Sequence, residues 1–227
     1  MLKLKSILYK KIFDNKLGVF ILNLNFKKRF KTSSDYWETR YSEEGNSGMG
    51  SYGALATYKA NVLNKFVNEN SVLKVTDFGC GDSNQVKEFD FPLYFGLDVS
   101  ITALEKCIHN FKNDHTKKFF IYEPKTFVDN LEIFKADLTL SLDVIYHLIE
   151  EETFESYMHH LFSSSSRFVI IYAWDVEGRK KMHVRHRKFT LWVEEKLKGW
   201  HLIQIIENKD LNRACDFFIY EKTNSSV

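Results

Sequence analysis

The chain has 227 residues, 44% of them hydrophobic and 15% aromatic, with only two prolines and ten glycines. These values are those of a globular protein and leave little room for a long flexible linker, and the length suits one α/β domain with an appendage. Three widely spaced cysteines without a C-x-x-C pair exclude a disulfide framework and a cysteine-based zinc site, and they favour a reducing cytoplasm.

The formal net charge of +2 conceals an asymmetry along the chain. Residues 1–31 hold nine Lys or Arg and one acid, so the totals of 32 basic and 30 acidic residues leave 23 and 29 for residues 32–227, a net charge of −6. We therefore divide the chain into a basic N-terminal extension, 1–31, and an acidic domain, 32–227. Apolar residues at helical spacing predict an amphipathic helix over residues 2–12 of the extension.

The extension has two interpretations. It could make a peripheral contact with an anionic membrane, which for a cytoplasmic protein is the inner face, or it could be an amphipathic helix with a solvated lysine face. Its most apolar run, 17–26, is far shorter than the roughly 20 residues that cross a bilayer. No small-x-small cleavage site follows the run, so we expect no export and place the protein in the cytoplasm.

The segment 45–53 contains four glycines among small polar residues, which predicts a flexible loop that could act as a lid. A helical pattern follows it over 55–66. From residue 72 onward, short apolar runs alternate with helical segments at 101–112, which Ser100 could cap, and at 150–162. The seven runs predict a seven-stranded, mostly parallel sheet with helices on both faces; they are 72–78, 93–99, 118–122, 138–143, 167–173, 200–206 and 217–220.

The first run ends in the sequence D-F-G-C-G-D at 77–82. Gly79 and Gly81 can adopt positive φ and let a ligand approach the backbone. Ligands of open parallel sheets bind at the carboxyl ends of the strands, where the strand order reverses. The second run ends in Asp98, whose carboxylate could accept hydrogen bonds from both ribose hydroxyls of an adenosine. Asp98 could instead cap the helix that starts after Ser100.

A nicotinamide cofactor fits this loop poorly. The dinucleotide fingerprint G-x-G-x-x-G requires a third glycine where this chain has Asn84. Asp82 would also repel a diphosphate, whereas an acid near a sulfonium or an amino group is tolerated. The pattern thus favours a methyl donor over a dinucleotide.

Three segments resemble the successive cofactor motifs of class I S-adenosylmethionine-dependent methyltransferases: D-F-G-C-G-D at 77–82, G-L-D-V-S at 96–100 and D-L-T-L-S-L-D-V-I-Y-H-L at 137–148. The resemblance covers roughly residues 72–220, and Tyr36, Trp37 and Arg40 with the glycine-rich loop are similar to the segment that precedes the domain and covers the cofactor in many members. It implies a Rossmann-like fold, an enzyme that transfers a methyl group, and S-adenosylmethionine as the cofactor.

The resemblance also implies roles for individual residues. Gly79 and Gly81 would lie under the methionine part of the cofactor, Asp98 would hold the ribose, and Arg40 could pair with the cofactor's carboxylate. The adenine contact is left open, since the segment after the third strand offers only Tyr122 and Glu123. The complete expected cofactor set is Tyr36, Trp37, Arg40, Asp77, Gly79, Gly81, Asp98, Val99, Ser141 and Leu142.

Two candidate catalytic residues, Asp143 and His147, stand near the carboxyl end of the fourth predicted strand. The cofactor brings its own leaving group, so the protein supplies orientation and, for a hydroxyl acceptor, a base. The ordinary pKa of histidine suits proton uptake near neutrality, which favours His147 as the base or as the residue that orients the acceptor. A purely structural histidine is the alternative.

A basic cluster follows the fifth predicted strand, and its arginines could grip a phosphate or carboxylate of the acceptor. A solvated basic loop or the start of a helix is the alternative. The H-x-x-H spacing of His183 and His186 lacks a third ligand nearby, so we expect no metal site. The expected acceptor-binding residues are Asp175, His183, Arg185, His186 and Arg187.

The acceptor is expected to be a small molecule or glycan precursor, methylated on an oxygen of a sugar or phosphate-type group. This expectation follows a resemblance to bacterial enzymes that modify surface polysaccharides or their precursors, carried by the arrangement from Tyr36 and Trp37 to H-V-R-H-R at 183–187. Nucleic acid is not expected as a partner, because the domain is acidic and has no aromatic-rich RNA motif. A non-catalytic scaffold docked on membranes and a nucleotide-dependent oxidoreductase are the alternatives.

Overall fold

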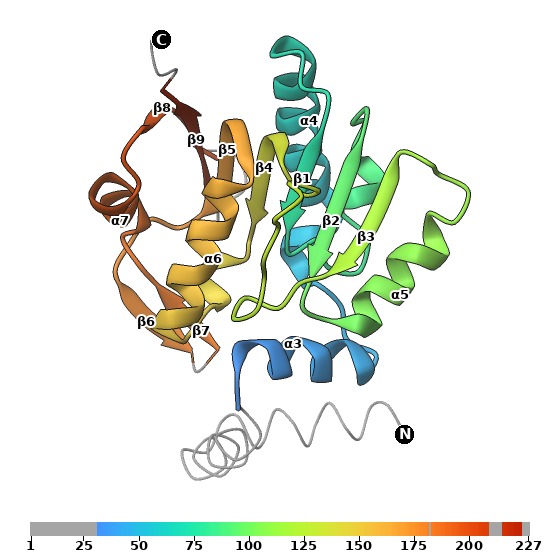
Figure 1. Ribbon diagram of the computed structural model, residues 1–227. Coiled ribbons are helices and arrows are strands. Elements are labelled where there is room, and N and C mark those ends of the chain that lie inside the picture. The colour runs from blue at the N-terminus through green and yellow to red at the C-terminus, as the bar shows by residue number, and fades with distance from the viewer. Residues whose placement is uncertain (1–30, 182, 209–214, 224–227) are drawn as a thin grey trace, which may run out of the picture.

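The computed structural model describes residues 31–181, 183–208 and 215–223. Within them, seven strands form one sheet in the order β3-β2-β1-β4-β5-β9-β8 (Figure 1). The expectations for residues 1–30, including helicity and membrane contact, lie outside the described residues. No helix in the described ranges is long and apolar enough to cross a membrane.

The sheet is mostly parallel, as the sequence predicts. Five neighbouring strands run parallel, and β9 is antiparallel to both β5 and β8, between which it lies. The strand order reverses between β1 and β4, which opens a crevice at their carboxyl ends. The strands are β1 (Val75–Phe78), β2 (Tyr94–Asp98), β3 (Lys117–Ile121), β4 (Ala136–Leu142), β5 (Ser165–Ala173), β8 (Trp200–Ile206) and β9 (Asp216–Lys222).

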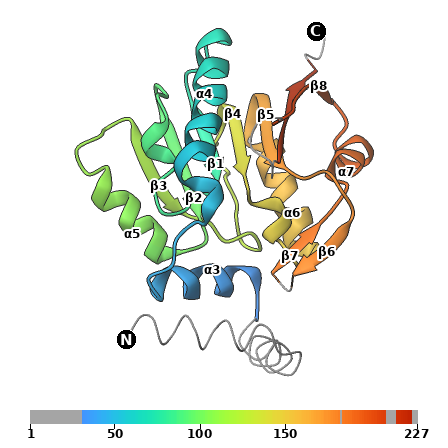
Figure 2. The same cartoon turned by 180° about the vertical axis from the view of Figure 1, so that it is seen from behind.

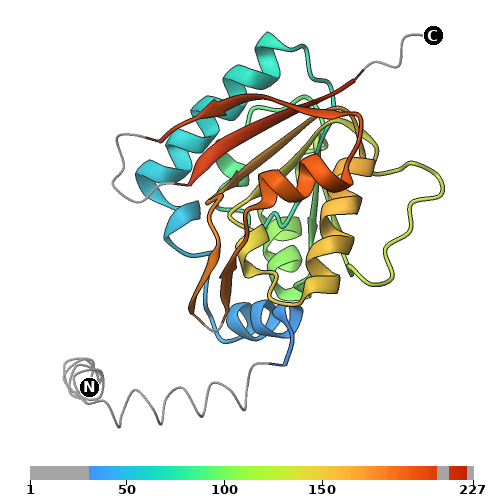
Figure 3. The same ribbon diagram turned by 90° about the vertical axis from the view of Figure 1, so that its left-hand side faces the viewer.

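In the described part of the chain, two helices cover each face of the sheet (Figure 3). Alternate residues of one strand serve opposite faces: Phe168 and Ile170 of β5 belong to the core that includes α4 (Gly53–Glu69) and α5 (Ile101–Asn110). Val169 and Ile171 belong to the core that includes α6 (Glu151–Ser163) and α7 (Phe189–Lys196). A parallel strand buried on both faces must be apolar throughout, which explains the continuous apolar runs of the sequence.

Helix α3 (Ser33–Ser42) crosses the carboxyl ends of the parallel strands (Figures 1 and 2). At its start, the Ser33 backbone N–H and hydroxyl donate to the two carboxylate oxygens of Glu150, at 2.9 and 2.6 Å. Toward its end, Glu38 accepts from the Ser100 hydroxyl at 2.7 Å and from the Thr102 hydroxyl at 2.6 Å. The helix is thus fastened to both halves of the crevice.

Some elements differ from the sequence prediction. The first strand begins at Val75 rather than at residue 72, because the Val72 N–H bonds the Val67 carbonyl and so closes the end of α4. The basic cluster is a hairpin, β6 (Gly178–Lys181) and β7 (Val184–His186), followed by α7 rather than a loop. Short 3-10 turns occupy Met49–Ser51, Val86–Glu88 and Ile145–His147.

Candidate functional site

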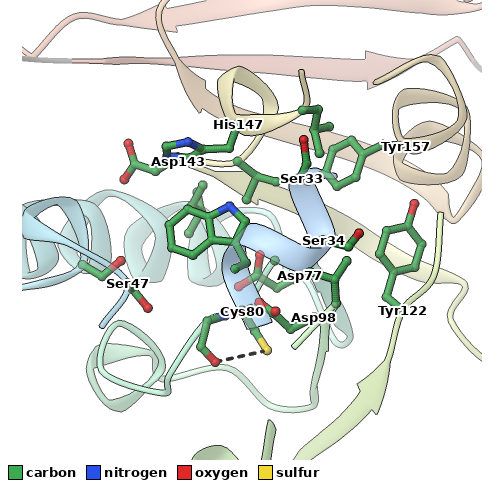
Figure 4. A pocket seen from close by; sticks show the side chains of 18 of the residues that line it. Ser33, Ser34, Ser47, Asp77, Cys80, Asp98, Tyr122, Asp143, His147 and Tyr157 are labelled. Atoms are coloured by element: carbon green, nitrogen blue, oxygen red, sulfur yellow. Dashed lines mark hydrogen bonds between the residues drawn. The ribbon is translucent and has the colours of Figure 1, made fainter. Parts of the chain in front are cut away.

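A cavity lies at the carboxyl ends of β1, β2 and β4, beneath α3 and the glycine-rich segment (Figure 4). Asp77 and Asp98 lie close to each other on its wall, Asp143 and His147 lie at one end, and Tyr122 lies at the other. Nine of the residues predicted from the sequence line it: Trp37, Asp77, Gly79, Gly81, Asp98, Val99, Leu142, Asp143 and His147.

The glycine loop after β1 needs its glycines for two reasons. Gly79 and Gly81 have φ values of 96° and 64°, in the left-handed region where a side chain is strained. A Cβ on Gly79 would also collide with the Val144 side chain, and one on Gly81 would collide with the Ser47 hydroxyl. The loop therefore presents bare backbone to the cavity.

Asp98 is buried at the tip of β2 and accepts backbone hydrogen bonds from Gly81 at 2.8 Å and from Ser100 at 2.9 Å. The helix cap is supplied by Ser100 itself, whose hydroxyl accepts from the Ala103 N–H. The alternative that Asp98 serves as this cap is therefore wrong. Burial raises the pKa of Asp98 to about 6, although the hydrogen bonds from Ser100 and Gly81 lower it.

Asp77 carries an unsatisfied carboxylate oxygen. Its Oδ2 accepts from the Tyr94 hydroxyl at 2.8 Å, while its buried Oδ1 has no hydrogen-bond partner among the described residues. Burial raises the pKa of this carboxyl to about 7. Because the raised pKa makes ionisation at neutral pH costly in the folded protein, a cation in the cavity would offset that cost.

The glycine-rich segment 45–53 is held against the loop after β1 by Asp82. This carboxylate accepts from the Ser47 N–H at 3.0 Å, the Ser47 hydroxyl at 2.8 Å and the Tyr52 hydroxyl at 2.9 Å. Ser47 also bonds the Tyr41 hydroxyl at 2.9 Å. Asp82 therefore holds the segment against this loop, a role that its sequence position alone did not reveal.

Asp143 follows β4 in a left-handed conformation with φ of 62°. Its Oδ2 accepts from the Lys59 ammonium at 2.7 Å, and its Oδ1 accepts from the Tyr146 hydroxyl at 2.8 Å. A Cβ on Gly50 would lie 2.7 Å from Oδ2, so the glycine-rich segment packs directly on this carboxylate. With both oxygens engaged, Asp143 is suited to positioning rather than to proton uptake.

His147 differs from the expectation based on its ordinary pKa. Its Nδ1 lies 2.9 Å from the His183 carbonyl oxygen, which can only accept, so Nδ1 carries the proton and Nε2 is the free acceptor. Burial lowers the pKa of His147 to about 4, which keeps the imidazole neutral at physiological pH but makes it a weaker base than expected. Its ring meets Trp37 edge to face, with centroids 4.9 Å apart.

Three residues of the expected cofactor set do not line the cavity. Arg40 donates to the Asn46 carbonyl at 2.6 Å and to the Tyr36 hydroxyl at 3.4 Å, and its guanidinium lies 5.3 Å from the Trp37 ring centroid. The Tyr36 ring stacks on His183, with centroids 4.8 Å apart. Ser141 is buried behind the wall, 2.7 Å from the Tyr157 hydroxyl. Their contact with a cofactor stays a prediction.

None of the five expected acceptor-binding residues lines the cavity either. Arg185 pairs with Glu151 at 2.7 Å, and Arg187 donates to the Leu148 carbonyl at 2.7 Å. Asp175 accepts from the backbone and hydroxyl of Thr190 at the start of α7, at 3.1 and 2.6 Å. The buried ring of His186 stacks on Trp174. The two arginines thus connect the hairpin region to the start of α6 and the loop before it, and the His183 carbonyl contacts His147. An acceptor-binding role stays a prediction.

The cavity includes residues that the sequence motifs did not reveal. Lys59 is the most distinctive, because a lysine inside a helical pattern predicts an exposed side chain and this one is fully buried. Tyr122 and Pro124 line the end near β2 and β3, where the sequence left the adenine contact open. No group of three or more His, Cys, Asp or Glu side chains in the described ranges is placed to hold a metal ion.

No family model matches the sequence, and no curated protein matches it significantly. Solved structures do share its fold. NodS, an N-methyltransferase from Bradyrhizobium japonicum WM9 in complex with S-adenosyl-L-homocysteine, superposes with a TM-score of 0.67 at 10% identity over 86% of this chain and 100% of that one. CalS10, an amino pentose methyltransferase from Micromonospora echinaspora bound to S-adenosylmethionine, gives 0.60 at 11% identity over 76% and 94%.

The small RNA methyltransferase HEN1 also superposes, with a TM-score of 0.59 at 16% identity over 78% of this chain and 26% of that one. At such identities the likeness establishes the fold, which is that of the Rossmann-like methyltransferases, and leaves the acceptor open.

Replacing Asp82 by Asn is expected to loosen the glycine-rich segment, because the neutral amide cannot accept the same three hydrogen bonds with the strength of a carboxylate. Amide hydrogen exchange in residues 45–53 should quicken by about tenfold or more, from a loss of roughly 1.5–3 kcal/mol. Asp90→Asn, at an exposed aspartate, is the matched control. Equal exchange rates in the wild type and in Asp82→Asn would show that the hydrogen bonds to Asp82 do not hold the segment.

Proposed function

We propose that the protein is an S-adenosylmethionine-dependent methyltransferase. The observation that carries the proposal is the unpartnered, buried Oδ1 of Asp77 beside the bare glycine loop and Asp98, at the point where the strand order reverses. An acid-lined cavity with exposed backbone suits a cationic ligand that carries ribose hydroxyls. When bound, S-adenosylmethionine supplies a methyl group on a positively charged sulfur that leaves as a neutral thioether.

Each wall of the cavity fits one part of this cofactor. Asp98 would accept hydrogen bonds from the ribose hydroxyls through the lone pairs that the backbone N–H groups leave free. Asp77 Oδ1 would accept from the amino group. Val99, Tyr122 and Pro124 form a largely apolar wall suited to the adenine ring, and the Tyr122 hydroxyl is held by His160 at 2.9 Å.

The acceptor would lie at the opposite end, near Trp37 and His147. Because Nδ1 of His147 is held by the His183 carbonyl, its Nε2 is available to accept a hydrogen bond from an acceptor hydroxyl. The low pKa keeps this nitrogen unprotonated, which suits orientation of the hydroxyl better than strong base catalysis. Asp143 would support this end by holding Tyr146, which contacts the His147 ring.

We infer that the acceptor is a small molecule or glycan precursor rather than a polyanion. The net charge of −6 over residues 32–227 disfavours RNA. The cavity lies under α3 and the glycine-rich segment, which cover part of it and so favour a small acceptor group. The shared fold of CalS10, an amino pentose methyltransferase, supports a sugar, whereas that of HEN1 makes RNA the contrast that a test must include.

Replacing Asp98 by Ala is expected to weaken S-adenosylhomocysteine binding at least about tenfold, because each hydrogen bond to a charged group contributes about 1.5–3 kcal/mol. Isothermal titration with S-adenosylhomocysteine and, separately, NAD measures the affinity. Asp90→Asn should bind like the wild type. Wild-type protein that ignores S-adenosylhomocysteine at millimolar concentration, or that prefers NAD, would end the methyltransferase proposal.

Cofactor affinity should fall as the pH is lowered. Burial raises the pKa of Asp77 to about 7 and that of Asp98 to about 6, whereas a bound cation favours the ionised carboxylates, so binding releases protons. Below each pKa, the affinity for S-adenosylmethionine should drop by up to about tenfold per pH unit for each carboxyl that must deprotonate. Calorimetric titrations between pH 8 and pH 5, in buffers of different ionisation enthalpy, measure the number of protons released on cofactor binding. A constant affinity with no proton release contradicts this account.

Replacing His147 by Ala is expected to reduce methyl transfer about 10- to 100-fold, because an acceptor hydroxyl then loses the nitrogen that orients it. The measurement is transfer of a radiolabelled methyl group from S-adenosylmethionine to a panel of nucleotide sugars, amino sugars and short RNA. Cofactor affinity should be unchanged. Full turnover in His147→Ala excludes this role for His147. Methylation confined to RNA overturns the proposed acceptor class. Cofactor binding by the wild type with no transfer to any acceptor favours the non-catalytic scaffold.

A further inference from the structure

Lys59 is a buried cation in the wall of the cavity. Its side chain is fully buried in α4, and its ammonium donates to Asp143 at 2.7 Å and lies 5.3 Å from the Tyr172 ring centroid. Among the described residues that line the cavity, it is the only Lys or Arg. An ammonium has three N–H donors, and Asp143 is the one hydrogen-bond acceptor that the described residues offer it.

Arg40, which the sequence suggested for the cofactor's carboxylate, is engaged elsewhere. Its guanidinium donates to Asn46 and Tyr36, lies against Trp37 and does not line the cavity. A carboxylate that enters a cavity whose wall carries Asp77, Asp98 and Asp143 would be repelled unless a cation meets it there. Lys59 is placed to be that cation.

We propose that Lys59 binds the carboxylate of the cofactor's amino-acid end, while the free Oδ1 of Asp77 accepts from its amino group. The inference rests on the proposed function. It assigns recognition of the charged amino-acid end of S-adenosylmethionine to Lys59 and Asp77, which line the same cavity. Lys59 reaches the cavity beside Leu142 and Asp143, at the carboxyl end of β4, and Asp77 lies at the end of the neighbouring strand β1. The Lys59 ammonium would thus meet the carboxylate of the amino acid, and the Asp77 carboxylate would meet its amino group.

Asp143 has a defined part in this arrangement. Burying an ammonium without a counter-charge is costly, and Asp143 offsets that cost. The glycine-rich segment packs at Gly50 against the same carboxylate oxygen, Oδ2. Lys59 also helps to lower the pKa of Asp77, which burial otherwise raises. A purely structural Lys59–Asp143 pair would order the segment and the loop after β4 without sensing the chemistry of the ligand.

The test compares two ligands that differ only in the carboxylate, S-adenosylmethionine and its decarboxylated form, by isothermal titration. Wild-type protein should prefer S-adenosylmethionine by about 10- to 100-fold, as a hydrogen-bonded ion pair in a buried site implies. In Lys59→Met this preference should collapse to within about threefold. Lys59→Arg, which keeps a cation, should retain most of it.

A second variant separates the two halves of the recognition. Asp77→Asn should weaken both ligands to a similar extent, because both carry the amino group, and so leave the preference between them intact. Lys65→Gln, at an exposed residue of the same helix, is the matched control and should change neither affinity. Where Lys59→Met alone is unstable, Lys59→Met with Asp143→Asn removes both charges and should lose the preference in the same way.

The ratio of the two affinities is measured within one protein, so a general loosening of the fold cancels from it. An unchanged ratio in Lys59→Met or in the double variant overturns the assignment of Lys59. Binding of 5′-methylthioadenosine, which lacks the amino-acid end, should survive in all Lys59 variants. Failure of the wild type to bind any of these adenosine ligands would instead overturn the proposed function itself.

Discussion

The site depends on one electrostatic constraint, the burial of carboxylates at adjacent strand tips. Asp77 is the penultimate residue of β1 and Asp98 is the last residue of β2. Both are buried, and burial raises the pKa of each. Backbone N–H groups stabilise Asp98, but Asp77 keeps one oxygen without a partner. A fold that holds such a group at neutral pH is less stable than one without it, unless a positively charged ligand supplies what the protein leaves out.

Helix α3 and the glycine-rich segment cover the cavity wall that carries Asp77 and Asp98. Helix α3 is fastened by Glu150 at one end and by its own Glu38 at the other, and Asp82 ties the glycine-rich segment to the loop after β1. Each tie joins segments that are far apart in the sequence through a carboxylate and several donors. Exclusion of water by such a cover strengthens every charged interaction beneath it.

The opposite end of the cavity is organised by side chains that hold one another. Lys59 and Tyr146 fix Asp143, and the His183 carbonyl fixes the tautomer of His147. The arginines of the β6–β7 hairpin region contact the loop before α6 rather than the cavity, so this basic segment supports the site from outside. In the function that we propose, the neutral imidazole of His147 orients the acceptor, and the buried Lys59 recognises the carboxylate of the cofactor.

The sequence by itself determined the sheet, because apolar runs that alternate with amphipathic segments allow few packings, and all seven predicted strands are present. It also located Gly79, Gly81 and Asp98, because a turn that needs positive φ and a carboxylate at a strand tip leave local signatures. Only the tertiary structure decided that Lys59 is buried, that Asp82 binds the glycine-rich segment and that Arg40 and Arg187 bind backbone carbonyls. The physical reason is that burial and partner choice depend on residues brought together from distant segments, as Lys59 meets Asp143, whereas backbone conformation is governed by neighbours along the chain.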